Sequence, residues 1–169
     1  MKIEDIQKRL EEEFGAVVGP VVQAAHGSWI EVDPDKVAEV CDFLKSGLEL
    51  KFDCLSNLSG VDYPAKDHIQ VVYNLFSYEL RHELTLKVNA ERGAPVVATV
   101  EKVWPAANWL EREVYDLLGV EFTGHSDLRR ILLPDDWIGH PLRKDYVEAP
   151  EYHGISTVRE SMLDIPGRS

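Results

Sequence analysis

Apolar residues recur three or four positions apart in three segments, the spacing that places side chains on one face of a helix. The first segment predicts a helix over residues 3–14, because Gly15 follows it as a stop. The second segment follows Asp33, which is expected to act as the N-terminal helix cap. Pro34 should open this second helix, and Gly47 should end it. Each helix should therefore pack on the body of the protein through one apolar stripe.

A third helix is expected to end at Leu118, because Gly119 follows it. Two signals compete for its start. Pro105 is suited to the first helical position, and a capping box could run from Asn108 to Glu111. The sequence therefore predicts the helix at about residues 105–118.

Six shorter segments are rich in β-branched and aromatic residues or alternate between apolar and polar positions, which is typical of strands. They are residues 16–24, 28–32, 50–58, 69–76, 83–88 and 96–100. The segments at 69–76 and 83–88 predict a hairpin, and His26 with Gly27 provides a turn between the first two strands. Strands without strict alternation with helices favour an α+β fold, with a mixed or antiparallel sheet and helices packed on one face.

Glycine and proline interrupt the chain repeatedly after Gly119, and no long periodic segment follows. We therefore expect an α+β domain over residues 1–119 and an extended C-terminal arm over residues 120–169. The third predicted helix belongs to the domain. Residues from about Glu148 onward are candidates for disorder unless a partner orders them, because they lack the pattern of a packed core.

Charge excludes one class of partner. The 169 residues include 18 Lys or Arg and 30 Asp or Glu, a net charge of −12. Nucleic-acid binding requires a basic surface that displaces phosphate counterions, so we expect no nucleic-acid partner. The longest uncharged apolar stretch, residues 15–25, is shorter than the ~20 residues that span a bilayer. A soluble or peripheral protein is expected.

Few residues have the pattern of a chemical site. Cys41 and Cys54 are expected to be free thiols, and no phosphate-binding glycine loop occurs. His125 and Asp127 could ligate a metal, but no further ligand follows at a familiar spacing, so a structural or interface role is preferred. A hydrolase that uses Glu113 and His125 is the most distant alternative.

The third helix has an unusual polar side. Trp109, Arg112, Glu113 and Asp116 lie together there, with Arg112 and Asp116 spaced for an ion pair, while Glu111 falls beyond the opposite edge of the apolar stripe. Tryptophan with arginine is typical of protein interfaces. A subunit interface, packing under the C-terminal arm, and catalysis are the three interpretations of this side.

Two basic pairs follow in the C-terminal arm, Arg129 with Arg130 and Arg143 with Lys144. These basic pairs contrast with the net negative charge of the whole chain. Arginine forms bidentate bonds with carboxylates, so these residues could join the arm to a partner or to carboxylates of the third helix. Ordinary solvated surface charge is the alternative.

Residues 103–146 resemble the signature of the 30-kilodalton subunit of proton-pumping NADH–quinone oxidoreductase, respiratory complex I. Many of its charged and aromatic positions are present here. The residues that form this signature, and that we predict to form a subunit interface, are Trp109, Glu111, Arg112, Glu113, Asp116, His125, Asp127, Arg129, Arg130, Trp137, Arg143, Lys144, Asp145 and Tyr146.

The resemblance implies a non-redox scaffold subunit of the hydrophilic arm of complex I, with no catalytic, cofactor-binding or metal-binding residues of its own. It implies packing against the 49-kilodalton subunit and neighbouring iron–sulfur subunits. The complex would contain FMN and iron–sulfur clusters and pass electrons from NADH to quinone. Membrane association would be only through the complex, on the cytoplasmic face of the bacterial inner membrane. The alternative is an equivalent subunit of a ferredoxin-, F420H2- or hydrogenase-linked relative.

Overall fold

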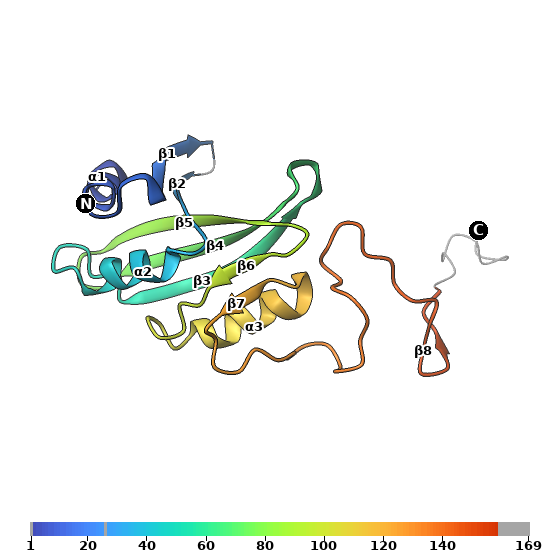
Figure 1. The fold of residues 1–169 in the computed structure, drawn as a ribbon. Coiled ribbons are helices and arrows are strands. Elements are labelled where there is room, and N and C mark those ends of the chain that lie inside the picture. The colour runs from blue at the N-terminus through green and yellow to red at the C-terminus, as the bar shows by residue number, and fades with distance from the viewer. Residues whose placement is uncertain (1, 26, 159–169) are drawn as a thin grey trace, which may run out of the picture.

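A five-stranded sheet forms the centre of the fold in the computed structural model, which describes residues 2–25 and 27–158 (Figure 1). The strand order is β1-β2-β5-β4-β3, and every neighbouring pair is antiparallel except β2 with β5, which is parallel. The strands of this sheet are β1 (Val18–Ala24), β2 (Gly27–Val32), β3 (Cys54–Tyr63), β4 (His68–Ser77) and β5 (His82–Glu91). The hairpin predicted from the sequence is thus confirmed as β4 and β5.

Three helices accompany the sheet. They are α1 (Ile3–Phe14), α2 (Val37–Ser46) and α3 (Ala107–Leu118), and short 3-10 turns occur at Gly15–Val17 and Pro64–Lys66. Alternate residues of β4 and β5, such as Tyr73 and Leu86, are fully buried, while Asn74 and Lys87 on the other face are partly exposed. The buried face joins residues of all three helices in one hydrophobic core. The predicted α+β class is confirmed.

A second, two-stranded sheet positions α3. Strand β6 (Val96–Ala98) pairs in parallel with β7 (Glu121–Thr123), and α3 forms the connection between them. Backbone bonds extend this pairing, with the N–H of Glu121 donating to Pro95 at 2.8 Å. The first residues of the C-terminal arm are thereby held beside the segment that precedes α3.

The structure corrects several predicted element boundaries. Helix α2 begins at Val37 because residues 34–36 form a turn, in which the N–H of Lys36 donates to the carbonyl of Asp33. The predicted strand at 50–58 lies later, at Cys54–Tyr63, and the one at 96–100 is shorter. Helix α3 begins at Ala107, so neither proposed start is correct. Asn108 is not a cap, because its side chain donates to Glu101 instead.

Residues 124–150 contain neither helix nor strand, and β8 (Glu151–Tyr152) then forms a small hairpin with β9 (Ile155–Ser156). Figure 1 shows this segment running along α3 and then extending beyond the sheet. The sequence pattern did not indicate this hairpin, which lies within the residues considered as candidates for disorder. Residues 159–169 lie outside the described part of the chain.

Gly60 is the point of closest packing between β3 and α3. A Cβ atom there would lie 2.3 Å from Leu118 and 3.1 Å from Val114, both buried. We expect Gly60→Ala to lower the free energy of unfolding by about 1–3 kcal/mol, because a methyl group would overpack this contact. Urea denaturation measures the change.

Gly93→Ala is the control for this prediction. A Cβ at Gly93 would meet only the Glu91 side chain, at 4.0 Å. Its stability should stay within about 0.5 kcal/mol of the wild type. Equal effects of the two substitutions would contradict the packing argument.

Candidate functional site

Asp116 is a fully buried carboxylate that binds the C-terminal arm to α3. One of its oxygens accepts the backbone N–H groups of Ile131, Leu132 and Leu133, at 3.1, 2.8 and 2.9 Å, and the other accepts from Arg130 at 2.8 Å. Burial alone would raise the pKa of this carboxyl group, but the four donors outweigh burial and lower it. Asp116 is therefore an ionised anchor for the arm.

The arm also covers the C-terminal end of α3. The last carbonyl groups of a helix have no partner inside the helix and must be bonded from elsewhere. Here each of the last three residues receives a donor from the arm: Nδ1 of His140 to the carbonyl of Asp116 (2.9 Å), N–H of Leu142 to Leu117 (3.0 Å), and Nε of Arg143 to Leu118 (2.7 Å).

Arg112 fixes the arm one turn earlier. Its guanidinium donates to the carbonyls of Arg129 and Arg130, at 3.2 and 3.4 Å, and lies 4.8 Å from the ring centroid of Trp109. The residue is only 6% exposed. The predicted ion pair between Arg112 and Asp116 is wrong, because Asp116 pairs with Arg130 and Arg112 bonds to the backbone of the arm.

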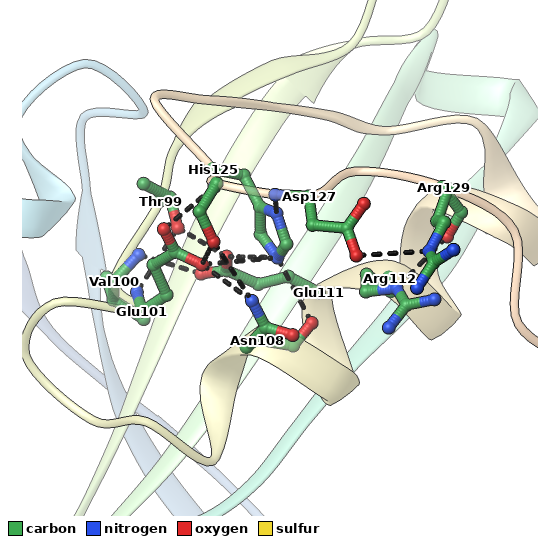
Figure 2. Close-up of polar contacts among 10 residues, drawn as sticks. Thr99, Val100, Glu101, Asn108, Glu111, Arg112, His125, Asp127 and Arg129 are labelled. Carbon is green, nitrogen blue, oxygen red and sulfur yellow. Dashed lines mark hydrogen bonds and ion pairs between the residues drawn. The ribbon is translucent and has the colours of Figure 1, made fainter.

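Glu111 is buried on the other side of α3, facing the loop that follows β6 (Figure 2). It accepts from the hydroxyl of Thr99 at 2.5 Å and from the N–H of Val100 at 2.7 Å. Burial raises the pKa of Glu111 to about 7, and these two hydrogen bonds offset only part of that shift. Because the helical wheel placed Glu111 beyond the edge of the apolar stripe, the sequence did not indicate its burial.

His125 joins the start of the C-terminal arm to the same cluster (Figure 2). Its buried ring donates through Nε2 to the carbonyl of Asn108 at 3.1 Å and accepts through Nδ1 from the N–H of Asp127 at 3.0 Å. A carbonyl only accepts and an N–H only donates, so the ring is the neutral Nε2–H tautomer. Glu101 and Glu111 lie 3.6 and 3.9 Å from the same nitrogen.

The geometry does not support a hydrolase that uses Glu113 and His125. Glu113 is exposed, whereas the side chain of His125 is buried and both its nitrogens are hydrogen-bonded. Among residues 2–25 and 27–158, no group of three or more His, Cys, Asp or Glu side chains could hold a metal ion. The described helices include none that is long and apolar enough to cross a membrane.

A second anchor, absent from the sequence predictions, lies at the end of the sheet. The buried side chain of Asp62 accepts two bonds from Arg92, at 2.7 and 3.0 Å, and the N–H of Lys144 at 2.8 Å. Arg92 also bonds to Asp145 at 2.5 Å. The bond from Arg92 lowers the pKa of Asp62. No sequence pattern links Asp62 to Lys144, because they are 82 positions apart.

The remaining predicted residues lie at or near the surface. Arg129 has a 73% exposed side chain and pairs with Asp127 at 3.0 Å, and Trp109 is 64% exposed. Trp137 and Tyr146 are half-buried in the arm. The signature thus separates into buried residues that hold the arm and exposed residues that could meet a partner.

Large apolar side chains are exposed along the same arm. Contiguous exposed apolar patches on a soluble protein often mark interaction sites. The large apolar side chains exposed by 53–85% on the arm and α3 are Trp109, Leu132, Ile138, Leu142, Val147, Ile155 and Val158. An α+β domain that fixes an arm of this kind with buried polar bonds is typical of a subunit of a larger assembly.

Comparison with known proteins identifies the assembly. The sequence model of the family described as "Respiratory-chain NADH dehydrogenase, 30 Kd subunit" matches residues 30–152. The chain belongs to this family, whose members are subunits of complex I. The predicted resemblance is confirmed.

Curated relatives agree with the family. The chain is 45% identical over 140 residues to the C subunit of NADH-quinone oxidoreductase from Geobacter metallireducens, covering 82% of this chain and 85% of that protein. It is 43% identical over 146 residues to the same subunit from Chlorobium phaeobacteroides, covering 85% and 88%.

Two solved structures share the fold. A trypsin-resistant fragment (1-134) of Nqo5 is 30% identical with a TM-score of 0.61, covering 73% of this chain and 98% of the fragment. A chain of the membrane-bound sulfane sulfur reductase, an archaeal respiratory membrane complex, is 26% identical with a TM-score of 0.70, covering 85% of each chain.

Arg112→Ala should lower the free energy of unfolding by about 2 kcal/mol, because it removes two charge-assisted hydrogen bonds from a buried side chain to the carbonyls of Arg129 and Arg130. Arg129→Ala should change it by less than about 0.5 kcal/mol, because its pair with Asp127 is exposed. Thermal and urea unfolding of the isolated protein distinguish the two. Equal stability of both variants would contradict the anchoring role of Arg112.

Glu111 should make stability depend on pH. Its pKa is raised in the folded state, so its contribution is fully present below the unfolded pKa near 4.5 and is lost as pH rises through about 7. Relative to Glu111→Gln, which resembles the protonated acid, the wild type should lose about 3 kcal/mol of unfolding free energy over this range. Urea unfolding of both proteins from pH 4.5 to 8 measures this loss. The prediction is refuted if the unfolding free energies of the wild type and of Glu111→Gln change with pH in parallel.

Proposed function

We propose that this chain is a non-redox scaffold subunit of the hydrophilic arm of NADH–quinone oxidoreductase. Its C-terminal arm, residues 120–169, would dock on the 49-kilodalton subunit and neighbouring iron–sulfur subunits. One observation supports this proposal above the others. The described part of the arm, residues 120–158, has little regular structure, yet polar bonds to buried side chains fix it to the domain while several of its apolar side chains remain exposed.

The two anchors explain how an irregular segment could recognise a partner. Asp116 holds the arm at residues 131–133, and Asp62 holds it again at Lys144. Between these points, one backbone bond from Leu142 and side-chain bonds from His140 and Arg143 to the end of α3 restrict the chain further. A surface ordered before binding loses less conformational entropy on association. The exposed members of the signature would then contact a partner in a fixed arrangement.

The proposed role places all redox chemistry in other subunits. The family's complex contains FMN and iron–sulfur clusters, and the buried side chains of Asp62, Arg112 and Asp116 hold this chain's own arm. Its contribution would be to position the subunits that pass electrons from NADH to quinone. Association with the cytoplasmic face of the membrane would then occur only through the complex.

The similarity to a chain of the sulfane sulfur reductase supports a second candidate, an equivalent subunit of a ferredoxin-, F420H2- or hydrogenase-linked relative. Mass spectrometry of proteins that co-purify with the tagged chain from solubilised membranes separates the candidates. NADH-binding and flavin-binding subunits should accompany the chain only in the first case.

Val147→Asp should reduce the recovery of intact complex at least several-fold, because it places a charge in the proposed interface. Val147 is 85% exposed, so the isolated protein should melt normally. Leu48→Asp is the matched control: Leu48 is 83% exposed but precedes β3, away from the arm. Recovery of complex is measured from solubilised membranes. Normal assembly of both variants would contradict docking through this part of the arm.

A further inference from the structure

A small pocket of about 80 Å³ lies in the arm between the turn at residues 134–138 and the β8–β9 hairpin. Three aromatic rings and three carboxylates contribute to its walls: Trp137, Tyr146, Tyr152, Asp136, Glu148 and Glu151. Cofactor and small-ligand sites are usually about 300–1,000 Å³. This pocket has room only for the end of a single side chain.

Polar bonds hold its walls in place. The Tyr152 hydroxyl donates to Asp136 at 2.9 Å, and Nε2 of His153 donates to the other oxygen of Asp136 at 2.7 Å. The rings of Trp137 and Tyr152 lie 5.1 Å apart. Gly139, at φ +84°, lets the ring of Tyr146 approach to 3.0 Å from where its Cβ would be. The pocket is therefore formed before any partner binds.

The lining favours a cation. Aromatic faces attract ammonium and guanidinium groups, and carboxylates at the rim add charge attraction. Within the described chain, Glu148 and Glu151 form no ion pair. Residues 134–158 contain five Asp or Glu and two Lys or Arg, so the surroundings are acidic.

The size of the pocket points to a side chain as the source of the cation, because about 80 Å³ admits little more than one ammonium or guanidinium group. The indole N–H of Trp137 is buried and finds no acceptor among the residues that the structure describes. A buried donor without an acceptor costs about 1–3 kcal/mol. A cation cannot accept this bond, so Trp137 meets the charged group through its ring, and its indole N–H serves as a probe of the pocket.

We propose that this pocket receives a lysine or arginine side chain of a neighbouring subunit. The proposal rests on the proposed function only in that the side chain belongs to another subunit of the complex. The aromatic rings and the carboxylates of Glu148 and Glu151 bind the charged end.

Indole N–H resonances of the ¹⁵N-labelled full chain test the cation preference. The Trp137 signal is assigned by its loss in Trp137→Phe. Titration with Nα-acetyl-arginine methylamide should shift this signal, whereas the neutral isostere Nα-acetyl-citrulline methylamide should leave it in place. A Glu148→Gln, Glu151→Gln double variant should lose the response, and Asp135→Asn, a neighbouring acid outside the pocket lining, should keep it. Equal shifts with both compounds, or none with either, overturn the proposal.

The chain's own Arg159 and Arg168 are competing occupants. A response that arises only in Arg159→Gln, Arg168→Gln would show that one of these side chains fills the pocket and would overturn an inter-subunit contact.

Competition between wild-type and variant chains for incorporation into the complex tests whether the pocket binds a neighbouring subunit. Wild-type and differently tagged variant chains are expressed together, and their ratio in the intact complex is measured by mass spectrometry. The Glu148→Gln, Glu151→Gln variant should be depleted about 10-fold relative to its total level, because the partner's charge loses its carboxylates. Asp135→Asn should enter at the wild-type ratio. Equal entry of both variants overturns this inference alone, whereas failure of the wild type to enter any such complex overturns the proposed function.

Discussion

One buried carboxylate connects the two parts of this protein. Asp116 lies on the last turn of α3 and accepts three consecutive backbone N–H groups and a guanidinium from the arm. Removing such an acceptor would remove four hydrogen bonds to a buried charge at once, and a hydrogen bond to a charged group contributes about 1.5–3 kcal/mol. Arg112 bonds only to the carbonyls of residues 129 and 130, so the course of the arm over residues 131–133 depends on the Asp116 side chain.

Two acids of the same helix show how the number of donors decides the charge state. Glu111 and Asp116 are both completely buried, five positions apart. Glu111 receives two hydrogen bonds and has a raised pKa, whereas Asp116 receives four and has a lowered one. Near neutral pH, α3 therefore holds one fixed negative charge toward the arm and one group close to its titration midpoint toward the core.

Periodicity predicted most of the fold, because α1, α2 and the β4–β5 hairpin each bury one regular face. The predictions from sequence were wrong where a side chain bonds to a segment that is distant in the sequence. Asn108 and Glu111 match a helix cap, but Glu101 and Thr99 bind them instead. The helical wheel placed Arg112 and Asp116 on a surface side, since it could not include the arm that covers them. The contact of Asp62 with Lys144 had no local signal, although most of the signature residues that surround these anchors were identified by resemblance.

The order of the bonds along the chain also has a consequence for biosynthesis. Asp116 precedes by 15 to 17 positions the three backbone groups that solvate it. A ribosome therefore releases the carboxylate before its donors, and during that interval the charge is stable only if water reaches the end of α3. The last turn of the helix can bond to the arm only after residues 130–133 have emerged. A nascent chain stalled before that point would carry an open, hydrated helix end.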